Sequence, residues 1–411
     1  MNNNTQNKRN FTKYKELYEK YNREEKTFFN TLNYKKKDEI FELEKQITDY
    51  KQFKEPMRFK FLSLNTIIDN KIAILRKYDE FNKLSPCSSE YSKLGKWIST
   101  ISQIPLGVYK EINPNKVSIS NFLLNIRKGL DKNIYGHVET KEQLIRILAQ
   151  YISNPSASGY VIGIQGSMGV GKTKFIKDGI AKIIDYPIAF IPLGGISDAS
   201  YLKGHSYTYE GSTYGKITEQ LIKTKVMNPI FLFDELDKVS NSRYGEEIIN
   251  TLIHITDATQ NEKFNDKYIE EIELDLSKSI IFFTFNNIEN VNPILRDRMI
   301  IIKVNKYTRE DKLKLVKHSL LENIFKSYNF TNDNVILSDE MIYYIIDNTV
   351  EEDGVRNLQR NINNIYSHIN MNRYIIIDDK LISFPFKVDK TTIDKYIIFK
   401  KENTNILSMY L

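Results

Sequence analysis

Short apolar runs alternate with amphipathic stretches between about residue 159 and residue 308 of the chain. This alternation predicts parallel strands joined by crossover helices, and therefore an α/β domain whose parallel sheet carries helices on both faces. We expect the strands at Tyr160–Ile164, Ile188–Leu193, Pro229–Phe233, Ser279–Phe285 and Met299–Val304.

Beyond Thr308 the strand patterns cease, and apolar residues recur three and four positions apart. This spacing is typical of amphipathic helices. We therefore expect a small helical domain in this part of the chain, with helices at about Arg309–Tyr328, Asp339–Asn348 and Val355–Asn370.

The N-terminal part of the chain also has helical patterns. The segment from about Lys13 to Phe53 contains no Gly or Pro and predicts one long helix. Its apolar positions keep no strict heptad, so a solvated helix that packs on a neighbour is favoured over a coiled coil. Two more helices are expected at Leu62–Tyr78 and Ser89–Ile101, each ending before a proline, and then a loop or linker at Gly107–Ser118.

Composition indicates a globular protein. With 411 residues, of which 41% are hydrophobic and 27% charged, the chain can bury a core for two or three domains. No stretch approaches the roughly 20 apolar residues of a membrane-spanning helix, and residues 1–10 are polar, so we expect a soluble cytoplasmic protein without membrane contact. The single cysteine, Cys87, excludes an intramolecular disulfide and a cysteine metal cage, and we assign it no role.

The net charge of +7 permits binding to nucleic acid or to an acidic partner. The lysines are scattered among many glutamates rather than gathered in one stripe, which makes this a weak indication. Nucleic acid therefore stays an open possibility as a partner.

The strongest motif is a glycine-rich loop between the first expected strand and an amphipathic helix. It fits the phosphate-binding pattern G-x-x-x-x-G-K-[ST]. Converging backbone N–H groups and the helix N-terminus would bind phosphate oxygens, Lys172 would reach the β- and γ-phosphates, and the Thr173 hydroxyl would bind Mg²⁺. The predicted ATP-binding residues are Gly166, Ser167, Met168, Gly169, Val170, Gly171, Lys172 and Thr173.

The third expected strand ends in two carboxylates, Asp234 and Glu235, roughly 60 residues after the glycine-rich loop. A charged strand end is common by itself. Beside a phosphate-binding loop, however, phosphoryl transfer needs one carboxylate near the metal and another to orient and deprotonate water. We assign Asp234 to the metal and Glu235 to the base, and we regard Asp237 and Lys238 as structural.

Three further polar residues are candidates for the same chemistry. Asn286 ends the fourth expected strand, where it would hold the attacking water, although asparagines at strand ends are more often turn formers. Arg298 precedes the last strand and would neutralise charge on a transferring phosphoryl group, from a neighbouring subunit if the chain assembles. Arg356 opens a helix of the small domain, where it would read the nucleotide state. Each arginine alone would be an ordinary surface residue.

Taken together, these segments resemble the AAA+ family and, within it, the ATPase part of Lon proteases. The resemblance covers about Glu55 to Ile397 and leaves the first 50 or so residues unassigned. Besides the motifs above, it rests on Ile134–His137, Gly194–Gly195, Lys203–His205, Thr208–Ser212, Gly354–Arg360, Leu84–Tyr91 and Trp97–Pro105.

The resemblance implies roles for individual residues. Asn286 corresponds to sensor 1, Arg298 to the arginine finger with Arg296 as a possible assistant, and Arg356 to sensor 2. Tyr135 and Gly136 correspond to the segment that packs around adenine. Tyr209 lies where the family's pore loop grips an extended polypeptide, but Glu210 stands where a second hydrophobic residue is usual.

The resemblance also implies an organisation. We expect an N-terminal helical region over 1–118, a large α/β ATPase domain over 119–306, and a small helical lid domain with a tail over 307–411. Lon proteases continue into a peptidase domain with a serine–lysine dyad, for which the residues after Ile376 leave no room. We therefore expect no peptidase activity.

The leading hypothesis is a Lon-like ATPase that assembles as a ring, expected to be a hexamer, and uses ATP and Mg²⁺ to pull or remodel a polypeptide. Arg298 would be idle in a monomer, which favours the ring. The alternatives are an ATPase that remodels nucleic acid and a scaffold that binds ATP but hydrolyses it poorly. The presence of Lys172, Glu235 and Arg298 argues against the scaffold.

Overall fold

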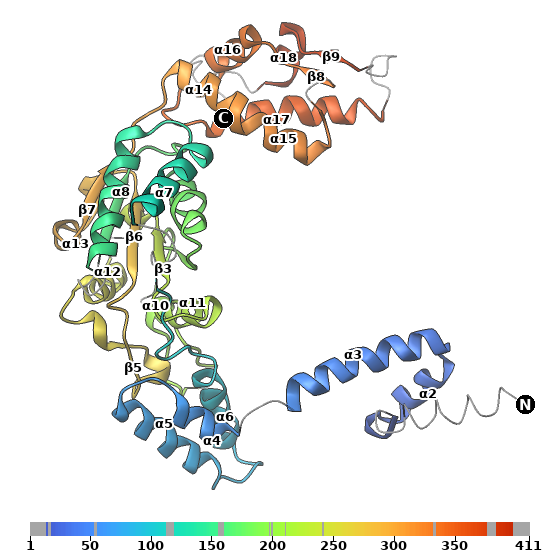
Figure 1. The fold of residues 1–411 in the computed structure, drawn as a ribbon, viewed down its shortest axis with the longest axis vertical. Coiled ribbons are helices and arrows are strands. Elements are labelled where there is room, and N and C mark those ends of the chain that lie inside the picture. Colours follow the sequence, from blue (N-terminus) through green and yellow to red (C-terminus); the bar gives the residue numbers. More distant parts are fainter. Residues whose placement is uncertain are drawn as a thin grey trace, which may run out of the picture. The chain divides into compact units, whose positions relative to one another are not determined.

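The structure is a computed structural model that describes residues 14, 18–52, 56–111, 119–154, 160–196, 198, 200–209, 211–240, 242–331, 334–375 and 384–397. The chain divides into two compact units, residues 1–64 and residues 65–411. Figure 1 labels their helices and strands. The expected domain boundaries at 118 and 306 stay a prediction.

The described part of the first unit includes the helices α2 (Arg23–Thr31), α3 (Tyr34–Gln52) and α4 (Met57–Ser63). The prediction of one long helix from Lys13 to Phe53 is wrong, because the chain breaks before α2 and again before α3. Asn22 accepts a hydrogen bond from the Glu25 backbone N–H, and Asn33 accepts one from the Lys36 backbone N–H. Asparagine side chains that bind the backbone in this way begin new helices.

Two helices open the second unit, α5 (Ile68–Phe81) and α6 (Ser89–Ile101). The bounds of α6 are those predicted. The predicted helix Leu62–Tyr78 is wrong in its first turns, because α4 ends at Ser63 and an extended segment precedes α5. The Asn65 carbonyl oxygen packs so closely on Gly107 that a Cβ there would lie 1.8 Å from it. Tertiary packing therefore sets this break.

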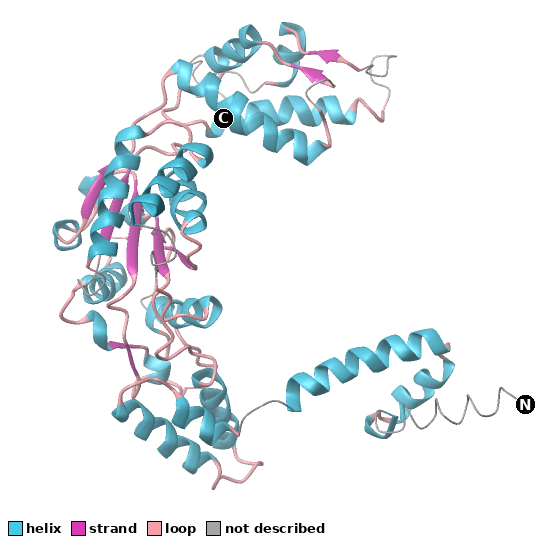
Figure 2. Ribbon diagram, viewed as in Figure 1, coloured by secondary structure: helices cyan, strands magenta, loops and turns pink. Residues whose placement is uncertain are grey.

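A five-stranded parallel sheet forms the centre of the second unit (Figure 2). Its strand order is β2-β3-β6-β1-β7, and each strand lies within one residue of its predicted bounds. The predicted α/β fold with a parallel sheet is thus confirmed. The strands are β1 (Val161–Gln165), β2 (Ile188–Pro192), β3 (Ile230–Asp234), β6 (Ile280–Phe285) and β7 (Ile300–Lys303).

Helices bury one face of this sheet in a continuous apolar core. Apolar side chains of α7 (Ile119–Asn133), α8 (Val138–Ser153) and a π-helical stretch (Phe175–Ala181) pack there against β1, β3, β6 and β7. On the opposite face of the sheet, Phe233 of β3 and Phe283 of β6 stack with ring centroids 5.2 Å apart. The strands buried in this way are nearly continuous apolar runs, as expected for a covered parallel sheet.

Short elements connect the strands. The two-residue strands β4 and β5 form an antiparallel pair that the sequence pattern did not indicate, because strands of this length have no periodicity. The connecting elements are α9 (Lys172–Lys174), α10 (Ser200–Lys203), α11 (Lys216–Thr224), α12 (Arg243–Thr256), β4 (Phe264–Asn265), β5 (Glu273–Leu274), α13 (Pro293–Asp297) and 3-10 turns at Leu236–Lys238, Asn261–Lys263, Lys267–Ile269 and Ile288–Asn290.

The C-terminal part is mainly helical and has its own apolar core. The three predicted helices are present within one residue, the first with a π-helical stretch (Val316–Leu320) in its middle. The expectation that strands cease after Thr308 is wrong, because β8 and β9 pair in parallel. The elements are α14 (Arg309–Leu315), α15 (Leu321–Tyr328), β8 (Val335–Ile336), α16 (Asp339–Asn348), α17 (Arg356–Met371), β9 (Phe386–Lys387) and α18 (Lys390–Tyr396).

None of the helices in the described part of the chain is both long enough and apolar enough to cross a membrane.

Candidate nucleotide site

Three neighbouring strands, β3, β6 and β1, deliver their carboxyl ends to one edge of the sheet. A cavity of about 420 Å³ opens at this edge. Ligands of open α/β sheets bind in such a position. The polar or loop residues that line it include Met168, Gly169, Val170, Gly171, Lys172, Thr173, Asp234, Glu235, Asp237, Asn286, Tyr307 and Arg356.

The glycine-rich loop follows β1 and turns into the helix that begins at Lys172. Gly169 and Gly171 have φ angles of 79° and 91°, a region that side chains with a Cβ rarely adopt. Gly166 packs closely, since a Cβ on it would lie 3.0 Å from the Val304 carbonyl oxygen. Val170 is buried and Met168 is exposed. The glycines thus shape the loop as the motif predicts.

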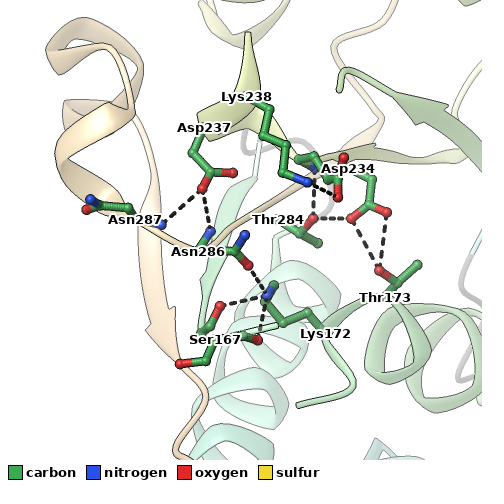
Figure 3. A network of polar contacts seen from close by, with 11 residues as sticks. Ser167, Lys172, Thr173, Asp234, Asp237, Lys238, Thr284, Asn286 and Asn287 are labelled. Atoms are coloured by element: carbon green, nitrogen blue, oxygen red, sulfur yellow. Dashed lines mark hydrogen bonds and ion pairs between the residues drawn. The ribbon is translucent and has the colours of Figure 1, made fainter. Parts of the chain in front are cut away.

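Lys172 lies at the centre of the site (Figure 3). Its Nζ donates hydrogen bonds to the Gly166 carbonyl at 2.6 Å, the Ser167 carbonyl at 3.0 Å and the Asn286 Oδ1 at 2.7 Å. Burial lowers the pKa of the Lys172 ammonium, and the nearby carboxylates, Asp234 foremost, act in the opposite direction. The ammonium is therefore positioned beside the loop and bound to the amide that ends β6.

Thr173 and Asp234 face one another across the site. The Thr173 Oγ1 lies 3.2 Å from the Asp234 Oδ1, and the Thr284 hydroxyl donates to the same carboxylate oxygen. Thr284 is a site residue that the sequence reasoning missed. The signal available was a single polar residue inside the otherwise apolar strand β6.

Glu235 occupies an unusual backbone conformation. Its φ of 63° lies in the left-handed region, which is rare for a residue with a side chain and is often found at functional sites. The turn aims the carboxylate toward Gly194, where an added Cβ would lie 2.3 Å from the Glu235 Oε2. Lys238 forms an ion pair with the other oxygen at 2.6 Å. The Glu235 carboxylate thus lies at the cavity, in space that is open because residue 194 is a glycine.

Asp237, which we regarded as structural, supports the end of β6. The backbone N–H groups of Asn286 and Asn287 both donate to the Asp237 Oδ2, each at 3.1 Å (Figure 3). This contact orients Asn286, whose side-chain oxygen accepts from Lys172. Asp237 therefore helps to position the candidate sensor residue.

The structure does not place Tyr135 and Gly136 among the residues that line the cavity. Gly136 has a φ of 72°, and the Tyr135 hydroxyl donates to Asp311 at 3.4 Å. Tyr307 lines the cavity instead; its hydroxyl donates to the Val170 carbonyl at 3.3 Å, and its ring centroid is 4.7 Å from that of His137. Burial lowers the pKa of His137. Sequence reasoning missed Tyr307.

Residues of the C-terminal helical part also line the cavity. The Val355 N–H donates to the Gly169 carbonyl at 3.2 Å, and the Ser167 hydroxyl donates to Asp353 at 2.6 Å. Gly354 touches the loop backbone, since a Cβ there would lie 2.3 Å from the Gly169 carbonyl carbon. These contacts place Arg356, the first residue of α17, on the cavity wall.

Arg298 lies away from this cavity, within the same chain. It forms an ion pair with Asp257 at 3.0 Å and donates to the Ile253 carbonyl at 3.0 Å, so the end of α12 holds its guanidinium. Its side chain is 30% exposed. Arg296, two residues earlier, is exposed.

Tyr209 lies in the loop between α10 and α11 and is 70% exposed. Its N–H donates to the Ser206 carbonyl at 3.2 Å. Glu210, the departure from the family pattern, lies outside the described residues.

The residues fit ATP with a magnesium ion. Oxygen ligands suit Mg²⁺, which binds one or two protein groups together with phosphate oxygens, and the Thr173 hydroxyl and Asp234 carboxylate provide such a pair. No group of three or more His, Cys, Asp or Glu side chains gathers anywhere in the described ranges, so a metal site made only of such side chains is not found there.

Comparison with known proteins identifies relatives of the chain. A family profile described as "ATPase family associated with various cellular activities (AAA)" matches residues 162–307. A "Lon protease homolog" of Acanthamoeba polyphaga mimivirus is 38% identical over 267 residues, 65% of this chain and 26% of that protein. A "Lon protease" of Mycoplasma genitalium is 30% identical over 371 residues, 90% of this chain and 43% of that protein. The chain thus spans less than half of the length of these relatives.

Proposed function

We propose that this protein is an ATP-hydrolysing motor that assembles as a ring and acts on polypeptides. The chain carries an AAA ATPase domain and is similar to Lon proteases. The observation that carries this proposal is the cavity at the sheet edge. It brings together the glycine-rich loop, the two carboxylates at the end of β3 and the amide that follows β6.

The residues around the cavity divide the chemistry among them. The backbone N–H groups of residues 166–173 and the Lys172 ammonium would hold the phosphates, and Thr173 with Asp234 would hold the magnesium ion. The ion, when bound, neutralises charge that develops on the phosphoryl oxygens. Thr284 keeps the Asp234 carboxylate facing Thr173 through its hydroxyl hydrogen bond.

Glu235 is the proposed general base. It would orient the attacking water and accept its proton while the water oxygen bonds to the γ-phosphorus and the bond from that phosphorus to the departing ADP oxygen breaks. Its ion pair with Lys238 holds the carboxylate at the rim, and Gly194 leaves it room. Asn286, oriented by Asp237, would contact the γ-phosphate or the water, and the charge of Arg356 would complete the site from the helical part.

The place of Arg298 supports the proposed assembly as a ring, for which we expect six subunits. Its guanidinium lies away from its own cavity, so a role on a phosphoryl group requires the cavity of a neighbouring subunit. The exposed ring of Tyr209 supports the polypeptide as substrate, because an exposed aromatic side chain on a loop can grip an extended chain without reading its sequence.

One comparison tests the proposal. ATP hydrolysis is measured for the protein alone, with unfolded casein, and with single- or double-stranded DNA. We expect casein to stimulate hydrolysis and DNA to leave it unchanged. Stimulation by DNA alone would instead support the nucleic-acid remodelling function, and binding of ATP with negligible turnover in every condition would support the scaffold. Cleavage of casein is followed in parallel, because the relatives are proteases.

A further inference from the structure

The loop that carries Tyr209 is fixed at its base. The His205 N–H donates to the Thr213 carbonyl at 3.1 Å, so the two limbs of the loop approach one another there. Gly204, with a φ of 72°, and Gly215 cross closely at the start and end of the loop. The exposed tip around Tyr209 therefore projects from a closed base.

A buried carboxylate fixes the second limb. Asp266 is fully buried and accepts hydrogen bonds from the Gly215 N–H at 2.8 Å, the Thr218 hydroxyl at 2.5 Å and the Tyr268 N–H at 2.9 Å. Burial raises the pKa of Asp266 to about 6, while these hydrogen bonds act in the opposite direction. The limb that leads into α11 thus has a rigid support within the domain.

The first limb is held by a lysine of α5. Lys77 is only 5% exposed, and its Nζ donates to the Tyr207 hydroxyl at 2.9 Å and forms an ion pair with Glu271 at 3.0 Å. The same ammonium lies 4.4 Å from the ring centroid of Tyr207 and 5.4 Å from that of Trp97. Burial of an ammonium group destabilises the fold unless the charge is paired. Here the glutamate, the tyrosine hydroxyl and the two aromatic rings provide the partners.

The surroundings keep this lysine charged. Burial alone would lower the pKa of Lys77, but the hydrogen bonds to Tyr207 and Glu271 outweigh burial and raise it. Arg76 pairs with the same glutamate at 2.7 Å, yet its side chain is 68% exposed. Arg76 is therefore a partner of Glu271, and Lys77 is the residue that also reaches the loop.

The second helix of this pair contacts the next residue of the loop. Lys93 of α6 donates to the Thr208 carbonyl at 3.1 Å. Two lysines, one from each helix, thus hold the two residues that immediately precede Tyr209. The helices α5 and α6 pack on one another, with the rings of Phe81 and Tyr91 stacked at 4.5 Å.

We propose that the α5–α6 helix pair is a brace for the Tyr209 loop, in which Lys77 and Lys93 are positioning residues that set how firmly the loop engages a polypeptide. The proposal rests on the proposed action on polypeptides. The brace would act by preorganisation, because a loop that is already ordered loses less conformational entropy when it binds its substrate. Helices outside the ATPase sheet thereby tune substrate engagement without touching the nucleotide.

Two substitutions each remove the hydrogen bond between Lys77 and the Tyr207 hydroxyl with little change in side-chain volume, and both leave the contact of Lys93 with Thr208 in place. Lys77→Met removes the ammonium and leaves Glu271 paired with Arg76, and Tyr207→Phe removes the hydroxyl but keeps the ring that the Lys77 ammonium faces. Arg76→Met is the matched control, because Glu271 then keeps Lys77. The full chain is used for every variant, and thermal unfolding confirms that each is folded.

Amide hydrogen exchange of peptides that span residues 205–213 measures the brace directly. We expect exchange at least threefold faster in Lys77→Met and in Tyr207→Phe than in the wild type, unchanged exchange in Arg76→Met, and no further increase in the Lys77→Met/Tyr207→Phe double variant. Equal exchange in the wild type and both single variants would overturn the brace.

Casein-stimulated ATP hydrolysis measures the consequence. The casein concentration for half-maximal stimulation should rise about fivefold or more in Lys77→Met and Tyr207→Phe, whereas the KM for ATP stays the same and Arg76→Met resembles the wild type. Faster loop exchange with an unchanged half-maximal concentration would overturn the positioning role. If casein fails to stimulate ATP hydrolysis by the wild type, the proposed function is contradicted. The exchange experiment would still test whether Lys77 and Tyr207 order the loop.

Discussion

At the scale of single residues, the candidate base shows how a strained backbone and a small neighbour cooperate. Glu235 directly follows β3 and has a positive φ, which turns its side chain out of the strand direction. The turned carboxylate then needs the space that Gly194 leaves open. A left-handed backbone conformation in a residue with a side chain costs of the order of 1–3 kcal/mol of folding free energy. Such conformations persist where the surrounding structure imposes them, and they cluster at functional sites.

We predict that Glu235→Gln leaves ATP binding within about threefold of the wild type and reduces hydrolysis at least a hundredfold. The substitution keeps the size of the side chain but removes the proton acceptor. Binding is measured by calorimetry and hydrolysis by phosphate release.

Lys172→Ala serves as the contrasting variant, because it removes the ammonium proposed to bind the phosphates and should weaken ATP binding itself. A Glu235→Gln protein that turned over at near the wild-type rate would exclude Glu235 as the base. Unchanged ATP affinity in Lys172→Ala would contradict the phosphate role of Lys172.

At the scale of elements, the contact between α17 and the phosphate-binding loop links the two sides of the cavity. Gly354 lies against the loop backbone, and Val355 and Asp353 on either side of it make hydrogen bonds to that loop. The contacts of Gly354 and Val355 are between backbone groups, which have no rotamers by which to move aside. The position of Arg356 therefore depends on the absence of a side chain at residue 354.

Gly354→Ala is expected to weaken ATP binding about tenfold or more, because the new methyl group would overlap the loop backbone and push the start of α17 away. Ser167→Ala, which removes only the hydrogen bond to Asp353, should have a smaller effect, within about threefold. Calorimetry with ATP gives both values. Wild-type affinity in Gly354→Ala would show that this contact does not support the nucleotide site.

At the scale of the whole molecule, the place of Arg298 determines whether the cavity is complete in one chain. The guanidinium is bound to Asp257 and the end of α12, which orients it while leaving its side chain partly exposed. In the proposed ring, this residue would serve the cavity of the next subunit.

Loss of Arg298 should therefore act in trans. Arg298→Ala is expected to bind ATP normally but to hydrolyse it of the order of a thousandfold more slowly. Mixing it with Glu235→Gln subunits should partly restore hydrolysis, because some interfaces in mixed rings then combine an intact Glu235 with an intact Arg298.

Subunit exchange is verified with labelled subunits in the same mixtures, and Arg296→Ala is tested in parallel as the neighbouring exposed arginine. A mixture that stays as inactive as its parents, although its subunits exchange, would exclude Arg298 as the trans-acting residue. Restored activity in mixtures with Arg296→Ala would transfer the role to Arg296.

The sequence by itself determined the five central strands, because a parallel sheet that is covered by helices requires almost uninterrupted apolar runs, and such runs are visible in the sequence. It also predicted a glycine-rich loop between β1 and the helix at Lys172, because glycines and a lysine at this spacing are typical of phosphate-binding loops. The order of these motifs along the chain was enough to predict the fold.

Only the tertiary structure decided which distant residues meet. Thr284, Asp237 and Tyr307 joined the site, and Tyr135 and Gly136 did not line it, because these places depend on the strand order and on the way α17 closes the cavity. The breaks before α2, α3 and α5 arose from single side-chain or backbone contacts that leave helical periodicity unchanged. Lys77 shows the same limit, because in the sequence it is one lysine among many. Only its burial beside Tyr207 distinguishes it. A charged group that is removed from solvent interacts more strongly with the few partners that the fold places beside it.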